Sequence, residues 1–136
     1  MSRRFFELIL AIKRKCQTNE EQIREQLGLS QAEFNGLLVL AEGQEITGCE
    51  FSQRMALSAS RGSRVLGTLV ADGYAATRIS PKDRRTVLIS LTERGVRAKE
   101  QIVRHMEACE SRICRGLDDA TIAKVKESLQ VLETVL

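Results

Sequence analysis

The chain has 136 residues, of which 43% are hydrophobic and 29% charged, which is the balance of one soluble globular domain and excludes a disordered or fibrous chain. Its 21 basic and 18 acidic residues leave a net charge of +3, but residues 54–99 alone carry 10 basic and 3 acidic groups. This basic middle predicts a localised surface for a polyanion, and a merely solvated basic face is the alternative.

Two amphipathic helices are predicted in the first part of the chain. Apolar residues at three- and four-residue steps indicate one face of a first helix of about 20 residues; these are Phe5, Leu8, Ile9, Ile12 and Cys16. Gly28 ends this helix, and Ser30 with Glu33 forms a capping box that begins the next one. The second helix ends at Gly43, and its buried stripe consists of Phe34, Leu37, Leu38 and Ala41.

A helix-turn-helix is predicted after these helices. Residues 46–48 are a short linker or an edge strand, and a brief helix with Phe51 and Met55 follows before a turn at Leu57-Ser58. Residues 59–72 then have the two faces of an amphipathic helix. The core stripe of that helix consists of Gly62, Val65, Leu66, Leu69 and Val70, and its outer face of Ser60, Arg61, Ser63, Arg64, Gly67, Thr68 and Ala71.

A hairpin and two further helices complete the chain. Residues 74–79 and 86–91 are strand-like runs, joined by a basic tip that contains the single proline, Pro81. Thr92 caps a long helix over residues 93–115, and Asp118 or Asp119 caps a final helix. In the final helix a coiled-coil-like seam is formed by Ile122, Val125, Leu129, Leu132 and Leu136.

The predicted fold class is therefore mainly α with a small β-hairpin, in which the helix-turn-helix and the hairpin form a winged helix-turn-helix. The second helix of such a motif enters the major groove, where Arg61 or Arg64 can reach guanine O6 and N7. A basic hairpin tip can reach the adjacent minor groove. The candidate DNA-binding residues are Ser58, Ser60, Arg61, Ser63, Arg64, Thr68, Arg78, Lys82, Asp83, Arg84 and Arg85.

The sequence lacks the patterns of an enzyme, a metal site or a membrane protein. It contains no nucleophile elbow, phosphate loop or dinucleotide fingerprint, so we expect no enzyme and assign no cofactor. The four cysteines form no Cys-x-x-Cys pair, so we expect small buried side chains and no metal ligands; they are Cys16, Cys49, Cys109 and Cys114. No apolar run approaches the roughly 18 residues of a membrane span, so we expect a cytoplasmic protein.

The helix-turn-helix and wing resemble those of the multiple-antibiotic-resistance regulator (MarR) family. The Asp-x-Arg signature of that family's wing falls on Asp83 and Arg85, and its Leu-Thr-Glu-x-Gly signature falls on residues 91–95. Further matches are found at residues 57–65, Leu69, Asp72, Gly73, Tyr74, Arg78, Arg84 and Leu88. The resemblance implies that Arg85 enters the minor groove and that Asp83 orients the wing. Arg78 either braces the hairpin or contacts a phosphate.

The resemblance also implies the organisation of the whole chain. It makes residues 1–136 a single MarR-like domain, with a DNA-binding lobe at residues 30–95 and a helical dimerisation region at residues 1–27 and 96–136. The protein is then a homodimeric regulator, expected to be a repressor, that binds a pseudo-palindromic double-stranded DNA operator. Its release by a small aromatic or anionic effector is the family's usual behaviour.

Two alternatives to an effector-controlled regulator remain open. Cys16 follows three cations, Lys13, Arg14 and Lys15, which favour a thiolate, so a redox-responsive regulator that uses Cys16 is one alternative. Peroxide-sensing members of the family have tyrosines near their reactive cysteine, whereas the only tyrosine here, Tyr74, belongs to the wing. The other alternative is a winged-helix module that binds protein through the same helix.

Overall fold

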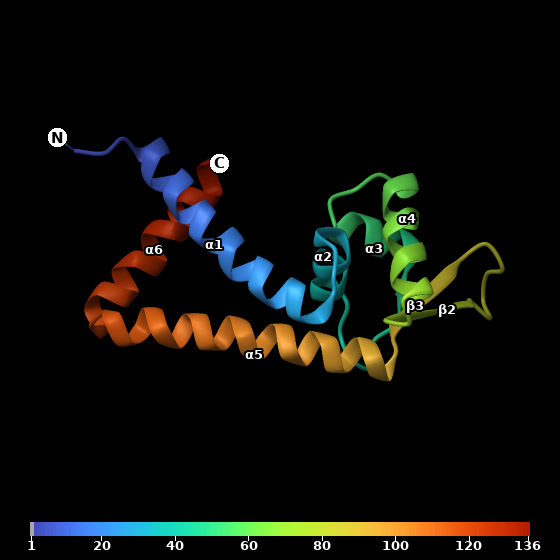
Figure 1. Ribbon diagram of the computed structural model, residues 1–136. Helices are drawn as coiled ribbons and strands as arrows, with labels where there is room; N and C mark the ends of the chain where they lie inside the picture. Colours follow the sequence, from blue (N-terminus) through green and yellow to red (C-terminus); the bar gives the residue numbers. More distant parts are fainter. Residues whose placement is uncertain (1) are drawn as a thin grey trace. The chain divides into compact units, whose positions relative to one another are not determined.

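The computed structural model describes residues 2–136, which divide into two compact units, Met1–Ile102 and Val103–Leu136. The boundary between the units falls inside one long helix, α5. The elements follow the chain as α1 (Phe5–Leu27), α2 (Gln31–Val39), β1 (Ile46–Thr47), α3 (Gly48–Arg54), α4 (Ala59–Ala71), β2 (Ala75–Ile79), β3 (Val87–Leu91), α5 (Glu93–Gly116) and α6 (Asp119–Val135) (Figure 1). The predicted fold class, mainly α with a winged helix-turn-helix, is confirmed.

The junction between α1 and α2 forms as its sequence predicts. The backbone of Gly28 ends α1 with a φ of 67°, a left-handed conformation that glycine adopts without a steric penalty. Ser30 Oγ accepts a hydrogen bond from the Glu33 N–H at 3.1 Å, and Glu33 Oε1 accepts one from the Ser30 N–H at 3.1 Å. These two reciprocal bonds confirm the capping box.

The second helix, α2, ends at Val39, earlier than the predicted end at Gly43. Its final carbonyl groups are bound by side chains from distant parts of the sequence. Arg54 Nη1 donates to the Val39 carbonyl at 3.1 Å, and Lys99 Nζ donates to the Leu40 carbonyl. Because these donors supply the bonds that another helical turn would make, the chain can leave the helix here without unpaired carbonyls. Burial of the ammonium group lowers the pKa of Lys99.

The two helices of the helix-turn-helix, α3 and α4, approach each other closely at Gly62. A Cβ atom at Gly62 would overlap the Ser52 hydroxyl and lie 2.8 Å from the Ser52 Cβ, so no larger residue fits this crossing. Val65 and Leu69 are buried on the same face of α4, as predicted. Val70, predicted in that stripe, is 39% exposed. The prediction for Val70 is wrong, because this residue lies at the edge of the predicted core stripe of the helix.

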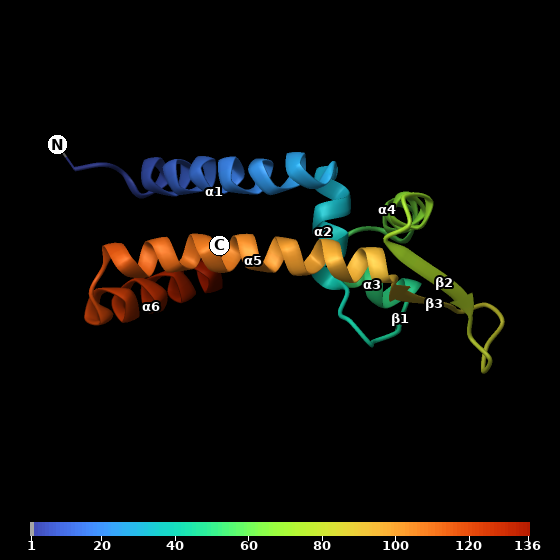
Figure 2. The same ribbon diagram turned by 60° about the horizontal axis from the view of Figure 1, so that its bottom comes forward.

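The three strands form one antiparallel sheet in the order β1-β3-β2 (Figure 2). In β1, Ile46 pairs with Ile89 of β3, so the edge strand is present. The predicted hairpin is confirmed, with Ile79 opposite Val87 at the end that leads into the tip. The hairpin extends away from the helices of its unit (Figure 1), which leaves the residues of its tip exposed.

The core of the Met1–Ile102 unit is formed by α2, α3, α4, the sheet and the first turns of α5. Its largest buried side chains are 2% exposed or less, and they are Phe34, Leu37, Leu40, Phe51, Leu69, Ile89 and Ile102. Phe34, Leu37 and Leu69 belong to the predicted apolar stripes, and Phe51 lies in the brief helix predicted before the turn. The sequence analysis did not predict Leu40, Ile89 and Ile102 as core residues. Burying each such side chain contributes about 1.5 to 3 kcal/mol to folding, so the winged helix has a hydrophobic core of its own.

Thr92 joins the turn after α4 to the beginning of α5. Its N–H donates to the Tyr74 carbonyl at 3.1 Å, and its hydroxyl donates to the Gly73 carbonyl at 2.5 Å. The same hydroxyl accepts from the Gly95 N–H at 3.1 Å, which confirms the predicted cap. A Cβ at Gly95 would overlap the Tyr74 carbonyl oxygen, so α5 begins in direct contact with the backbone of Tyr74, just before β2.

The Val103–Leu136 unit contains the rest of α5 and the whole of α6. The Asp118 carboxylate accepts from the Thr121 N–H at 2.8 Å, so Asp118 is the cap of the predicted pair, and its hydrogen bonds to Thr121 lower the pKa of Asp118. None of the residues of α6, all of which the structure describes, is buried. Along the predicted seam, Val125 is 41% and Leu129 49% exposed.

Candidate nucleic-acid interface

The outer face of α4 presents small and basic side chains to solvent. The exposed residues there are Ser60, Arg61, Ser63, Arg64, Gly67 and Thr68. Within residues 2–136, neither the Arg61 nor the Arg64 guanidinium has a hydrogen-bond or ion-pair partner. A Cβ at Gly67 would meet nothing within 4 Å. This face therefore has two free cations and a stretch of bare backbone, which suits close approach to an anionic groove.

Two of the predicted hydroxyl groups already make hydrogen bonds inside the lobe. Ser58 Oγ accepts from the Arg61 N–H at 3.3 Å and lies 3.3 Å from Ser60 Oγ, so Ser58 is the N-cap of α4. Thr68 Oγ1 donates to the Val65 carbonyl at 2.7 Å, one turn back in the same helix. Ser58 and Thr68 thus help to define α4, whereas Ser63 makes no such bond among the described residues.

The tip of the hairpin is organised around Asp83. One oxygen of its carboxylate accepts from the Arg85 N–H at 3.0 Å and the other from the Thr86 hydroxyl at 3.1 Å. The role of orienting the wing, which the resemblance implies for Asp83, fits this geometry, in which its partners are a backbone N–H and a hydroxyl. The side chains of Lys82, Arg84 and Arg85 are exposed and have no ion-pair partner among the described residues.

Arg78 is held at the base of the wing by a carboxylate that the sequence did not suggest. Its Nε and Nη2 atoms donate to Glu45 at 2.6 and 2.7 Å, a two-pronged ion pair. Glu45 lies just before β1, so the pair spans the central strand β3. The Arg78 hydrogen bonds lower the pKa of Glu45, and Glu45 raises the pKa of Arg78. This is the geometry of the brace, one of the two roles considered for Arg78.

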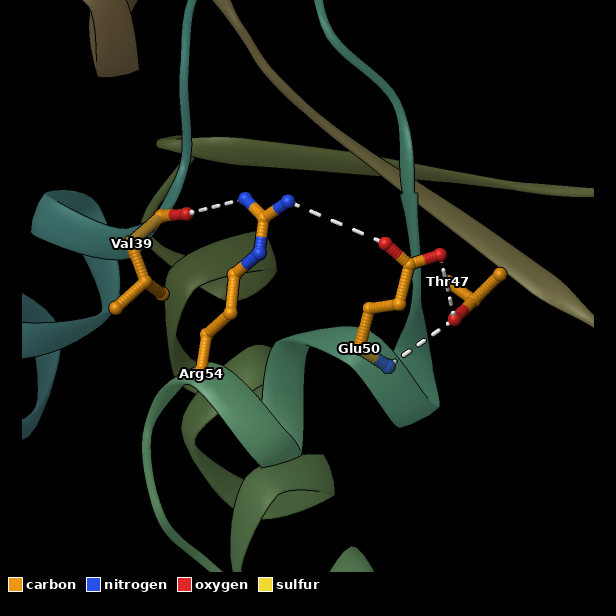
Figure 3. Close-up of polar contacts among 4 residues, drawn as sticks. All are labelled: Val39, Thr47, Glu50 and Arg54. Atoms are coloured by element: carbon orange, nitrogen blue, oxygen red, sulfur yellow. Dashed lines mark hydrogen bonds and ion pairs between the residues drawn. The ribbon is translucent and has the colours of Figure 1, made fainter.

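Figure 3 shows how α3 is fixed against the end of α2. Thr47 Oγ1 accepts from the Glu50 N–H at 3.1 Å, which caps α3. Glu50 in turn lies 4.0 Å from Arg54, whose other nitrogen binds the Val39 carbonyl (Figure 3). The helix that supports α4 is therefore anchored at both ends. Sequence reasoning missed the contact of Arg54, because its partner is 15 residues away.

The cysteines differ from the prediction of small buried side chains. Cys16, Cys49 and Cys114 are exposed and Cys109 is partly exposed. That prediction is wrong, since these residues lie on helix faces that nothing in the single chain covers. Among residues 2–136 no group of three or more His, Cys, Asp or Glu side chains could hold a metal ion. In the same residues no helix has the length and apolar character to cross a membrane.

A compact helix-turn-helix followed by a β-hairpin with a basic tip defines a winged helix-turn-helix protein. The sequence model of the MarR family matches residues 27–86, from the end of α1 to the tip of the hairpin. This match confirms the resemblance to the MarR family that was seen in the sequence. No curated protein sequence matches the chain.

Solved structures with the same fold have low sequence identity to this chain. Streptococcus pneumoniae FabT in complex with DNA has a TM-score of 0.89 and 23% identity, covering 97% of this chain and 94% of FabT. The S. aureus MepR–DNA complex has a TM-score of 0.84 and 18% identity, covering 99% of this chain and 100% of MepR. The reduced form of MarR from E. coli has a TM-score of 0.78 and 21% identity, covering 97% of this chain and 98% of MarR. At such identities the likeness concerns the fold.

Proposed function

We propose that this chain is a sequence-specific, double-stranded DNA-binding transcriptional regulator that acts as a homodimeric repressor. The observation that carries the proposal is the face of α4, small and bearing the unpaired cations Arg61 and Arg64, followed by a wing tip whose cations are also unpaired. The MarR-family segment supports this function, and FabT and MepR, which share the fold, were solved with DNA. A cytoplasmic location goes with such a function.

In this proposal α4 reads the major groove. Arg61 and Arg64 donate to base edges, where an arginine can bind guanine through two hydrogen bonds. Ser60 and Ser63 contact phosphates or base edges, and the hydroxyl groups of Ser58 and Thr68 add phosphate contacts that they share with their bonds inside α4. Phosphate contacts fix the orientation of the helix, while the arginine contacts select the sequence.

The wing contacts the neighbouring minor groove in the same proposal. Arg85 enters that groove, and Lys82 and Arg84 bind the flanking phosphates. Asp83 acts on DNA indirectly, because its carboxylate holds the loop in which Arg85 lies. Arg78 positions the wing through Glu45 and makes no direct contact with DNA.

The homodimer is supported by the apolar side chains that the single chain leaves exposed. In α1, Phe5 is 76% and Ile12 is 53% exposed, and in the Val103–Leu136 unit Ile113 is 59% and Val135 74% exposed. Surfaces of this kind on a soluble protein are normally covered by a partner. A second copy places two α4 helices on one duplex, so we expect a pseudo-palindromic operator with half-sites roughly 34 Å apart.

The signal that releases the DNA is a small aromatic or anionic effector in this proposal. Oxidation at Cys16 is the alternative signal, and the exposure of its thiol is compatible with it. The two are separated by treating the DNA-bound protein with peroxide. Release from the wild type that is lost in Cys16→Ser establishes the redox signal, whereas equal release or none rejects it.

Salt dependence tests the proposed function directly. A duplex selected from a random pool should bind with an affinity whose logarithm falls linearly with the logarithm of salt concentration, with a slope of about −0.9 per phosphate contact. A selected sequence that is a pseudo-palindrome would support the dimer as well. Absence of binding to any duplex at low salt would reject DNA binding and leave a winged-helix module that binds protein.

Substitutions then separate the roles of α4 and the wing. Arg64→Ala should cost roughly 1 to 3 kcal/mol of binding free energy and relax the preference at one base pair. Arg85→Ala should weaken binding and reduce the preference for A·T pairs beside the half-site. Arg115→Ala in the Val103–Leu136 unit is the matched control, since it removes the same charge outside the lobe. An Arg85→Ala variant with unchanged affinity and salt slope would place Arg85 outside the interface.

A further inference from the structure

A groove of about 380 Å³ lies between the two elements that we propose contact DNA, the helix α4 and the hairpin. Its lining includes Ser63 and Leu66 of α4 and Val87 of β3. The helix α4 also packs against β2, so the helix and the hairpin are neighbours in the Met1–Ile102 unit (Figure 1). The described side chains leave this space open, so another molecule can occupy it.

The hairpin side of this groove is an exposed apolar pair. Ile79, the last residue of β2, lies directly opposite Val87, the first residue of β3. Residues that face each other in an antiparallel pair point to the same side of the sheet, so Ile79 extends the apolar surface of Val87. Ile89, two residues further along β3, points to this side as well and is completely buried. The core therefore covers this side of the sheet at Ile89 and leaves it bare at Val87 and Ile79, which are 39% and 63% exposed.

Cations flank the groove on both sides, and none of the described residues in its lining carries a carboxylate. Arg61 and Arg64 lie on the outer face of α4, and the tip of the hairpin carries further cations on the other side. The Ser63 hydroxyl and the Gln53 side-chain amide line the groove, are exposed and have no hydrogen-bond partner among the described residues. The groove thus combines an apolar wall, free donors and positive surroundings, which fits a molecule that alternates apolar and anionic groups.

We propose that this groove seats one sugar–phosphate strand of the operator, the strand that separates the major groove from the adjacent minor groove. This inference rests on the proposed function. Two neighbouring grooves of a duplex are separated by one such strand, so when α4 enters the first groove and the wing tip the second, that strand runs between them. Gln53 and Ser63 donate to its phosphates, while Val87 and Ile79 pack against the C–H edges of its deoxyribose rings.

The apolar contacts add affinity of a different kind from that of the cations. A cation bound to a phosphate releases counterions, so its contribution falls as the salt concentration rises. Burial of apolar surface releases no counterions and contributes about fourfold in affinity for each methylene-sized group. Loss of the apolar wall should therefore weaken DNA binding by the same factor at every salt concentration.

The apolar wall is tested with the double variant Ile79→Thr/Val87→Thr, because threonine keeps the β-branching that suits a strand and adds a polar group. This variant should bind the selected duplex roughly tenfold more weakly, with an unchanged salt slope. Val70→Thr is the matched control, since Val70 is also 39% exposed, belongs to α4 and does not line the groove. An affinity equal to that of the control overturns the apolar contact, as does a loss that vanishes at high salt.

The phosphate contact of Gln53 is tested separately with Gln53→Leu, which keeps most of the side-chain volume and removes the donor. This variant should bind the duplex roughly threefold more weakly, the effect of one hydrogen bond. Gln44→Leu is the control, because Gln44 is an exposed glutamine that does not line the groove. Equal affinities of the two variants would remove Gln53 from the contacts of the strand.

Cleavage of the bound duplex by hydroxyl radicals locates the seated strand, because these radicals attack deoxyribose rings that the protein leaves accessible. In the wild-type complex, one strand should be protected between the base pairs affected by Arg64→Ala and those affected by Arg85→Ala. At saturating protein, the double variant should restore cleavage at these sugars and keep the other protected positions. The wild-type pattern alone decides the proposal if the double variant does not fold.

Two negative results have different meanings. A duplex that is bound by the wild type but cleaved freely between the two grooves overturns the seating of the strand and leaves the proposed function intact. Absence of binding to any duplex rejects the proposed function and this inference with it.

Discussion

The winged-helix lobe and the Val103–Leu136 unit use their apolar residues in opposite ways. In the lobe, residues such as Phe51, Leu69 and Ile89 are completely buried within one chain. In the Val103–Leu136 unit, α6 has no buried residue, and Leu129 is 49% exposed. The lobe is thus stabilised by its own core, whereas the unit leaves apolar side chains exposed.

The charged side chains of the two regions also differ. In the lobe the apolar residues face inward, and Arg61 and Arg64 have no partner within residues 2–136. The second unit has few buried contacts, and its charged side chains form weak exposed pairs such as Lys126 with Glu110 at 4.0 Å. We therefore expect substitutions in the lobe to act on folding and DNA binding, and substitutions in the second unit to act on assembly.

The largest effect is expected from a charge in the exposed apolar seam. Leu129→Glu should raise the dissociation constant of the dimer by roughly 30- to 100-fold, or about 2 to 3 kcal/mol, because a buried carboxylate would have no partner. Sedimentation equilibrium measures this constant. Lys124→Glu, on another face of α6, is the control and should leave the dimer intact. If Leu129→Glu stays dimeric, the seam is not the interface.

The next effect concerns the helix crossing inside the lobe. Gly62→Ala places a methyl group against Ser52 and should destabilise the protein by about 1 to 3 kcal/mol, as overpacking does. Gly67→Ala, in the same helix with open space around it, should stabilise the protein by up to about 1 kcal/mol through helix propensity. Urea denaturation gives both values. The same sign for the two variants would contradict the close crossing.

A smaller gain is expected when the buried carboxyl group of Glu33 is made neutral. Burial and the nearby Asp72 carboxylate raise the pKa of Glu33, whose Oε2 has no hydrogen-bond partner among the described residues. The folded protein therefore keeps the proton to a higher pH than the unfolded chain, and stability falls as the pH rises through that interval. Glu33→Gln keeps the acceptor for Ser30 and should add at most about 1 kcal/mol at neutral pH.

The pH dependence of unfolding checks the Glu33 prediction. The wild type should lose stability between the ordinary pKa of a glutamate and the raised pKa of Glu33, and Glu33→Gln should lose that slope. Denaturation curves at several pH values provide the comparison. A wild type and variant with parallel pH profiles would show that the carboxyl group does not titrate differently on folding.

The smallest effect is expected at the base of the wing, where the ion pair is exposed. Because Arg78 lowers the pKa of Glu45, the contribution of this pair is complete above the ordinary pKa of a glutamate and is lost as the pH falls through the lowered value. Chemical shifts of Arg78 Nε should follow that loss in the wild type. In Glu45→Gln they should not change with pH in this range.

The parts of the fold that the sequence predicted are those determined by neighbouring residues. The capping box at Ser30, the cap at Thr92 and the hairpin all depend on residues a few positions apart, as does the exposed face of α4. Sequence patterns contain such short-range information. The end of α2 was predicted too late, because it is set by Arg54 and Lys99 through contacts across the fold.

The candidate DNA-binding site likewise has features set by neighbouring residues and features set by distant contacts. The free cations of α4 and the wing could be predicted from spacing and charge, but the partner of Arg78 could not, since Glu45 lies 33 residues away without any local pattern. The exposure of the cysteines was missed because the prediction assumed that one chain covers all of its helix faces.

The hydroxyl of Thr92 has a mechanical consequence for the lobe. It bonds both the carbonyl at the end of the α4 turn and an N–H in the first turn of α5, within a contact too tight for any Cβ at Gly95. The turn that follows α4 and the first turn of α5 are therefore connected by direct hydrogen bonds and close backbone packing. A displacement of the first turn of α5 would have to break these contacts or move the turn after α4 with it.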